Sequence, residues 1–133
     1  MTENEISYFI RGSIYEVYNK LGAGLFESVY AVALEWELRN SGLEVKREAV
    51  VPVEYKNVRM DLGFKLDLLV EEKVIIEVKS VANLEAVHHK QMLTYLKLTD
   101  LKLAILVNFN VANINDGMFR KVNGLNLPTQ IGT

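Results

Sequence analysis

The sequence predicts a mixed α/β domain in which helices pack against a single sheet, in the element order ααβββαβ(β). Apolar residues recur at steps of three and four in two N-terminal stretches and again near residue 90, and at steps of two between residues 43 and 53. Half of the 133 residues are apolar and 24% are charged. This composition excludes a disordered chain and fits a single domain over 1–133.

Three helices are expected. The first covers about 4–20, with Asn4 as its N-cap, and ends at the glycines of 21–24. The second covers about 26–40 and is stopped by Ser41-Gly42. The third follows two predicted strands and covers about 84–99.

The strands are expected where apolar residues alternate or form short runs between turn signals. They cover 43–53, 64–70, 74–81 and 101–109, with a short last strand over 118–122. We expect a turn at 55–58, a loop over 108–115 and a frayed tail over 125–133.

Composition also excludes several kinds of site. The chain has no cysteine, and therefore no disulfide, thiolate nucleophile or cysteine-based metal site. The N-terminus lacks the pattern of a signal peptide, and the longest clean apolar run, 103–107, is too short to span a bilayer. We therefore expect a cytoplasmic protein with no membrane partner. The net charge of −2 differs from that of a dedicated basic DNA-binding module, so any nucleic-acid function must rest on a local site.

The candidate chemistry lies on a predicted hairpin of two apolar strands, one carrying Asp67 and the other Glu77 and Lys79. If 71–73 forms the loop, Asp67 faces Glu77, Lys65 faces Lys79, and both carboxylates and Lys79 project from one face. Opposed residues have Cβ atoms about 5 Å apart, so the carboxylates repel each other unless a cation lies between them. Hard oxygen ligands suit Mg²⁺ or Mn²⁺, and Lys79 would stand beside the water of such a cation.

Two alternatives to this interpretation stay open. A two-residue loop would place Leu66 opposite Glu77 and separate the carboxylates. A solvated sheet face, with Glu77 and Lys79 as an ordinary exposed ion pair, explains the same residues without a metal.

Polar residues on two helices add to the pattern. Gln91 and Tyr95 are four residues apart and share a helix face, and His88 precedes them by one turn. A helix-edge glutamine and a half-buried tyrosine are the structural alternative. Glu27 and Tyr30 lie in the first turn of the second helix, where Glu27 also suits the helix dipole.

Taken together, these residues resemble a known family. Gly24-x-x-Glu27-x-x-Tyr30, Asp67, Glu77-Val78-Lys79 and Gln91-x-x-x-Tyr95 occur in the order found in the GxxExxY proteins of the PD-(D/E)XK nuclease-like superfamily. The resemblance covers about 5–124. It implies a restriction-endonuclease-like core, in which helices flank a mixed β-sheet and the site is built on the second and third strands. Leu66 stands where the superfamily's nominal motif has proline.

The resemblance also implies roles for the site residues. Metal ligands would be Asp67, Glu77, the backbone carbonyl of Val78, and Glu27. The catalytic residues would be the two strand carboxylates with Lys79, Gln91 and Tyr95. His88 and Tyr30 would lie just behind these groups, and His89 would lie on the surface.

The expected function is that of a Mg²⁺-dependent (or Mn²⁺-dependent) nuclease that hydrolyses phosphodiester bonds of DNA with a metal-activated water. The alternative is a catalytically silent module on the same fold that binds nucleic acid or another protein. The expected partner is nucleic acid, with DNA favoured, and the sequence is compatible with a homo-oligomer or a larger complex.

Overall fold

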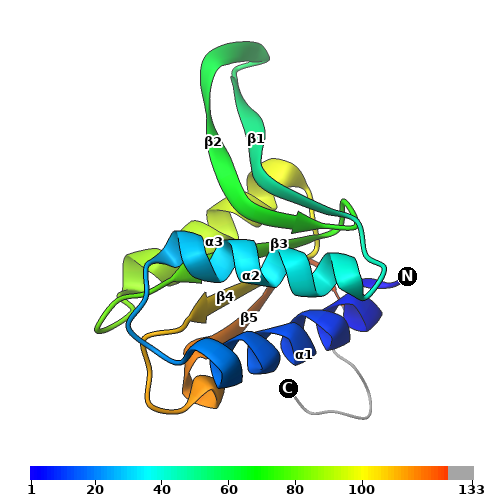
Figure 1. Cartoon of the computed structure of the whole chain (residues 1–133). Coiled ribbons are helices and arrows are strands. Elements are labelled where there is room, and N and C mark those ends of the chain that lie inside the picture. Colours follow the sequence, from blue (N-terminus) through cyan, green and yellow to red (C-terminus); the bar gives the residue numbers. More distant parts are fainter. Residues whose placement is uncertain (126–133) are drawn as a thin grey trace.

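The computed structural model describes residues 1–125, which form one five-stranded sheet with helices on both faces (Figure 1). The element order agrees with the predicted one, and the predicted tail after Leu125 lies outside the described residues. The elements are helices α1 (Glu3–Leu21) and α2 (Glu27–Asn40), strands β1 (Val45–Tyr55), β2 (Val58–Val70) and β3 (Val74–Lys79), helix α3 (Ala86–Thr99), strand β4 (Leu103–Asn108), the 3-10 turn η1 (Ile114–Gly117) and strand β5 (Met118–Val122).

The sheet is mixed, with strand order β1-β2-β3-β4-β5. Among the neighbouring strands, β3 and β4 alone are parallel. The helix α3 connects them and returns the chain to the end of the sheet at which β3 begins. The other neighbours are antiparallel. Within residues 1–125, every helix is too short or too polar to cross a bilayer.

Helix α1 begins at Glu3, one residue before the predicted start, and Thr2 rather than Asn4 is its N-cap. The Thr2 hydroxyl accepts a hydrogen bond from the Glu5 backbone N–H, and the Glu5 carboxylate accepts one from the Thr2 backbone N–H. This reciprocal pair needs an acidic residue three positions after the cap, which Thr2 has and Asn4 lacks. The Asn4 side chain accepts a hydrogen bond from Arg120 instead.

Strand β2 begins six residues before the predicted start, and with β1 it forms a hairpin that rises from the sheet (Figure 1). The turn consists of Lys56 and Asn57, both left-handed with φ of +52° and +65°, which closes the hairpin at the pair Tyr55–Val58. We call residues 49–66 the arm. The predicted turn at 55–58 lies at its tip, and the exposed residues that follow alternate apolar and polar side chains, a strand signal that the prediction missed.

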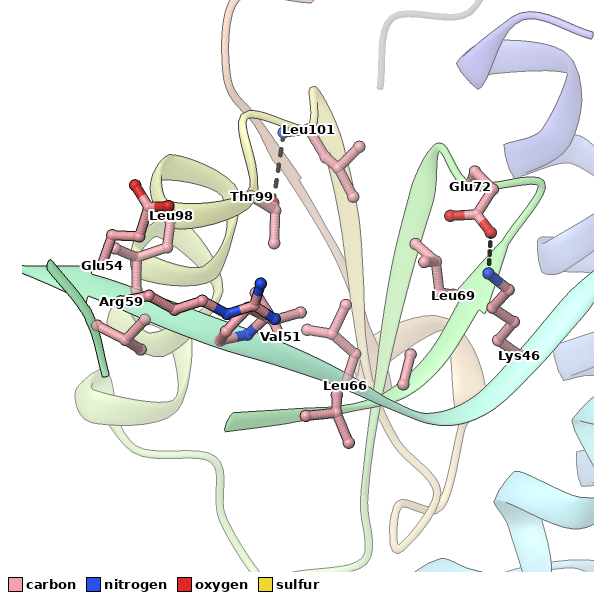
Figure 2. Close-up of a pocket in the computed structure, with 14 residues that line it drawn as sticks. Lys46, Val51, Glu54, Arg59, Leu66, Leu69, Glu72, Leu98, Thr99 and Leu101 are labelled. Atoms are coloured by element: carbon pink, nitrogen blue, oxygen red, sulfur yellow. Dashed lines mark hydrogen bonds and ion pairs between the residues drawn. The ribbon is translucent and has the colours of Figure 1, made fainter. Parts of the chain in front are cut away.

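A groove of about 740 Å³ lies between the arm and the C-terminal end of α3 (Figure 2). Apolar side chains of Val51, Leu66 and Leu98 line it, and an ion pair between Lys46 and Glu72 closes one end. None of the predicted site residues lines this groove, so it is separate from the candidate chemistry.

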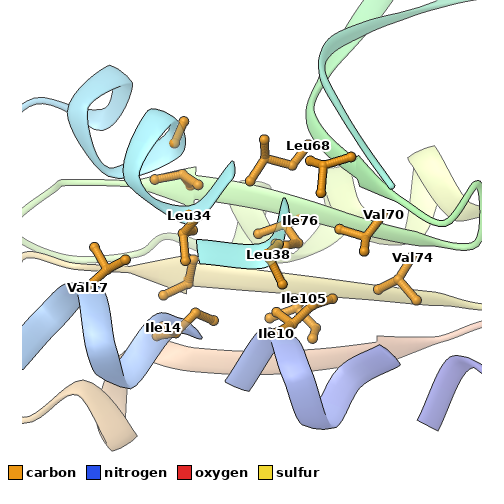
Figure 3. Packing of buried hydrophobic residues seen from close by; sticks show 14 of the residues in the cluster. Ile10, Ile14, Val17, Leu34, Leu38, Leu68, Val70, Val74, Ile76 and Ile105 are labelled. Atoms are coloured by element: carbon orange, nitrogen blue, oxygen red, sulfur yellow. The ribbon is translucent and has the colours of Figure 1, made fainter. Parts of the chain in front are cut away.

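Two hydrophobic clusters hold the layers together. The larger one joins α1 and α2 to one face of the sheet, and Figure 3 shows Ile10 and Ile14 of α1 and Leu34 and Leu38 of α2 packed against strand residues such as Ile76. The smaller one joins α3 to the other face and consists of Leu66, Ile75, Met92, Leu96, Ala104 and Leu106.

The hairpin bends at the point where the arm leaves the sheet. Residues two apart on a regular strand share a face, yet Leu68 belongs to the α1–α2 cluster and Leu66 to the α3 cluster. On β1, Glu48 is left-handed with φ of +55° at the position opposite Asp67 in the register. The bend therefore falls at Asp67 and turns the arm over α3.

Candidate active site

The predicted register of the β2–β3 hairpin is confirmed over the three pairs next to the turn. Val70 pairs with Val74 and Leu68 with Ile76, and the ladder ends there. Glu71 and Glu72 are left-handed at φ of +55° and +56°, which forms the predicted loop. The predicted pairing of Lys65 with Lys79 is wrong. Lys65 pairs with Val50 of β1, because β2 bends away from β3 at Asp67.

Carboxylates take the place of backbone partners where the two strands separate. The Asp67 backbone N–H donates to Oε1 of Glu77 at 2.9 Å, and the Val78 backbone N–H donates to Oδ2 of Asp67 at 2.8 Å. Such hydrogen bonds are worth about 0.5–1.5 kcal/mol where the acceptor is neutral and about 1.5–3 kcal/mol where it is charged. The structure thus brings Asp67 and Glu77 together across the split, as the register predicts.

Glu77 is buried, with only 4% of its surface exposed. Burial, together with the neighbouring charge of Asp67, raises the pKa of Glu77 to about 8, while the charge of Lys79 acts in the opposite direction. The interpretation of Glu77 and Lys79 as an ordinary exposed ion pair is therefore wrong. A buried carboxylate held beside another one is destabilised in its charged form, and a cation would remove that penalty.

The donor set fits a hard divalent cation. One oxygen of each carboxylate is used by a backbone N–H, while Asp67 Oδ1 and Glu77 Oε2 have no backbone or cationic donor among residues 1–125. The N–H and C=O of a strand residue point to the same side, so the Val78 carbonyl also faces the split. Two carboxylate oxygens and a carbonyl are ligands that Mg²⁺ and Mn²⁺ prefer.

Lys79 lies at the end of β3, partly exposed, and pairs in register with Asn108 of β4. Glu77 and Lys79 are two positions apart on β3, so their side chains project from the same face of the sheet, and the charge of Lys79 lowers the pKa of Glu77. The backbone N–H of Phe109 donates to the Lys79 carbonyl at 2.9 Å and fixes this end of the strand.

Tyr95 of α3 packs against the smaller cluster, which lies on the face of the sheet that also carries Glu77. Burial raises the pKa of the Tyr95 hydroxyl, and the charges of Glu77 and Asp67 raise it further. The Tyr95 ring stacks on Phe64 of the arm, with centroids 4.4 Å apart. Gln91 lies one turn earlier on the same helix and is half-buried. Its predicted role at the site stays a prediction.

Glu27 and Tyr30 are positioned by the start of α2. Glu27 is the first residue of the helix and is partly buried. The side chain of Tyr30 is fully buried and faces the α1–α2 cluster. In the described part of the chain, no third Asp, Glu, His or Cys joins Asp67 and Glu77 in a group with the geometry of a metal site, so Glu27 stays a predicted ligand.

The two histidines of α3 have local contacts. His88 Nδ1 accepts a hydrogen bond from the Glu85 backbone N–H at 3.0 Å and so caps the helix. His89 is half-buried, packs edge-on against Phe119 at 4.8 Å, and differs in this from the predicted surface residue. Burial and the charge of Lys121 lower the pKa of His89.

Two residues that support the site were missed in the sequence. Asn108 lies where the predicted strand over 101–109 and the predicted loop over 108–115 overlap; it is 2% exposed at the end of β4, and its side chain bonds both the N–H and the C=O of Val81. Ser80 donates to the Leu25 carbonyl at 2.6 Å. Asn108 could have been found as a polar residue that ends the apolar run of β4, whereas Ser80 gives no signal.

The layered fold, with one parallel strand pair inside an otherwise antiparallel sheet, is of the restriction-endonuclease-like α/β class. A family model described as "PD-(D/E)XK nuclease superfamily" matches residues 4–121. The chain belongs to this superfamily, as its resemblance to these proteins predicts. Nucleases of this superfamily usually use divalent metal ions.

Among solved structures, one titled "Crystal structure of SSO0001" is similar, with a TM-score of 0.54 and 23% sequence identity. The similarity covers 75% of this chain and 52% of that one, so this chain matches about half of the longer protein. At this identity the likeness supports the fold alone. No functionally curated protein matches the chain.

Proposed function

We propose that this chain is a nuclease of the GxxExxY type that hydrolyses phosphodiester bonds of DNA with Mg²⁺ or Mn²⁺. One observation supports it most. Asp67 and Glu77 meet where β2 leaves β3, and each keeps one oxygen that a cation can bind. Burying Glu77 beside a second carboxylate is costly in a fold that needs no cation there. A cytoplasmic location is part of this proposal, as is assembly into a homo-oligomer or a larger complex.

In this proposal, Asp67, Glu77 and the Val78 carbonyl hold the cation, with Glu27 as a fourth group. The bound cation supplies Lewis-acid activation of water and neutralises charge on the phosphate. The ammonium group of Lys79 orients the attacking water and stabilises the negative charge that develops on the phosphate oxygens.

Tyr95 and Gln91 border the same site from α3. The pKa of the Tyr95 hydroxyl is raised by burial and by the carboxylates, so the hydroxyl stays protonated and can donate to a phosphate oxygen. Gln91, one turn earlier, offers an amide for contacts with the nucleic acid.

One observation favours a second candidate function. Asp67 and Glu77 already bond backbone N–H groups across the split strands, so they can brace the sheet without a metal. The chain would then be a catalytically silent module that binds nucleic acid or protein.

The test is a cleavage screen with Mg²⁺ and Mn²⁺ over linear duplex DNA, single-stranded DNA, branched DNA and RNA. We expect cleavage of DNA that falls at least about 100-fold in Asp67→Asn, Glu77→Gln and Lys79→Ala, because each removes a group that acts on the transition state. The matched controls are the exposed arm residues Asp61, Glu54 and Lys65, changed in the same way.

Each outcome separates the two candidates. Binding to nucleic acid without turnover by the wild-type protein, at any of these metals, would support the silent module. Equal activity in site and control variants would show that cleavage comes from elsewhere.

A further inference from the structure

Five residues form a closed ring of contacts behind the candidate site, which we call the latch: Leu25, Tyr30, Lys79, Ser80 and Phe109. They come from the loop before α2, from α2 itself, from the end of β3 and from the end of β4. No sequence motif joins all five, and the ring is visible only in the folded chain.

The latch begins at the glycine-containing loop between α1 and α2. The Tyr30 hydroxyl donates to the Gly22 carbonyl at 2.5 Å and accepts from the Leu25 backbone N–H at 3.1 Å. Gly24 is left-handed in this loop, with φ of +97°, a conformation that glycine adopts without cost. Tyr30, from the start of α2, therefore bonds the backbone of the loop that precedes this helix on both sides of Gly24.

Two further contacts close the ring onto β3. The Ser80 hydroxyl donates to the Leu25 carbonyl at 2.6 Å, directly after Lys79 in the chain. The Tyr30 ring stacks on Phe109 with centroids 4.2 Å apart, and the Phe109 backbone N–H donates to the Lys79 carbonyl at 2.9 Å. The loop before α2 is thus tied to Ser80, which follows Lys79 in the chain, and through Tyr30 and Phe109 to the backbone carbonyl of Lys79 itself.

We propose that Tyr30 and Ser80 are positioning residues, which fix Lys79 and Glu27 relative to the carboxylates through the latch. This inference rests on the proposed nuclease function. Glu27 follows Leu25 by two residues, so the start of α2 moves with the loop. Groups that orient metal ligands from behind affect metal affinity or activity about 10- to 100-fold when removed.

The test uses Tyr30→Phe, which keeps the ring stack and removes the hydroxyl, and Ser80→Ala. The matched controls are Tyr18→Phe, whose hydroxyl bonds the Val111 and Ala112 carbonyls at 2.6 and 3.0 Å, and Ser41→Ala, whose hydroxyl bonds the Glu37 carbonyl at 3.1 Å. Each control removes similar hydrogen bonds away from the latch.

We measure Mn²⁺ affinity by isothermal titration calorimetry, kcat and KM for duplex DNA, and Tm. We expect both latch variants to weaken Mn²⁺ affinity and lower kcat about 10-fold, with KM unchanged and Tm lowered no more than in the controls. Ser80→Thr, which keeps the hydroxyl, should restore wild-type values. The double variant should lose less than the product of the single losses, because both bonds hold one loop.

The latch inference is overturned if the latch variants and the controls have equal Mn²⁺ affinity and kcat while the wild-type protein binds metal and cleaves DNA. A wild-type protein that binds no Mn²⁺ overturns the proposed function itself, and the latch inference with it. The two failures are therefore distinguishable by the wild-type titration alone.

Discussion

The two faces of the sheet differ in what they bury. Twenty buried hydrophobic residues join the α1–α2 face, and the polar groups buried with them, the Tyr30 hydroxyl and Ser13 of α1, are uncharged. Six apolar residues join the α3 face, and beside them the same face buries the carboxylate of Glu77. Since hydrophobic stabilisation grows with the apolar area removed from water, the α1–α2 face supplies the larger share of the hydrophobic stabilisation.

This difference indicates which face of the sheet can contain a buried ionisable group. A buried carboxylate costs free energy, and the cost is tolerable where another face of the domain holds the structure together. The α3 face also carries the groove under the arm, so its packing is less dense at one end. We therefore expect a substitution in the α1–α2 cluster to lower the free energy of unfolding more than an equivalent substitution in the α3 cluster.

The largest expected effect compares two leucines, Leu34 of α2 and Leu96 of α3, both fully buried. Leu→Ala substitutions in cores cost about 2–5 kcal/mol, and more where the surroundings cannot relax into the cavity. We expect the loss of unfolding free energy to lie near the upper end of this range for Leu34→Ala and near the lower end for Leu96→Ala. Urea unfolding measures both losses, and the m-values should stay unchanged. An equal or larger loss in Leu96→Ala would contradict the ranking of the two faces.

The second expected effect is a pH dependence that arises from Glu77. Its pKa is raised from 4.5 to about 8 by burial and by Asp67. Between these values the unfolded chain is ionised while the folded chain keeps the proton, so unfolding releases a proton and rising pH lowers the free energy of unfolding. The slope is at most about 1.4 kcal/mol per pH unit, and it ends above pH 8.

Chemical denaturation of wild-type protein and Glu77→Gln at pH 5, 6, 7 and 8 measures this effect. The stability of the variant relative to wild type should rise through the series, whereas the exposed Glu54→Gln should follow wild type. Saturating Mn²⁺ should reduce the wild-type slope, because the cation stabilises the ionised carboxylate. A difference between wild type and Glu77→Gln that stays constant with pH would exclude a raised pKa.

Much of this fold could be predicted, because periodicity and turn residues are local properties of the chain. The element order followed from hydrophobic periodicity, and the register beside the 71–73 loop followed from the assumed length of that loop. The start of β2 was missed although its signal is present: a turn was predicted at 55–58, and apolar residues alternate with others from Val58 onward.

The candidate site was predictable as a set of residue types, but its geometry was not. Asp67 and Glu77 were identified as polar residues in apolar strands, whereas the bend at Glu48 depends on one left-handed residue that no periodicity reveals. The latch depends on contacts between Tyr30, Ser80 and Phe109, which are distant in the sequence. Such contacts arise from tertiary packing and require the three-dimensional structure.

The smallest expected effect concerns the link between the arm and α3. Phe64 of the arm stacks on Tyr95 at 4.4 Å, and such aromatic pairs contribute about 0.5–1.5 kcal/mol beyond the area they bury. Phe64→Leu should therefore lower the free energy of unfolding by about 1 kcal/mol, while the 83% exposed Phe26 changed to leucine should stay within about 0.5 kcal/mol of wild type. Urea unfolding measures both. A loss in Phe64→Leu as small as in Phe26→Leu would mean that the arm moves independently of α3, and that the smaller face of the sheet ends at Leu66.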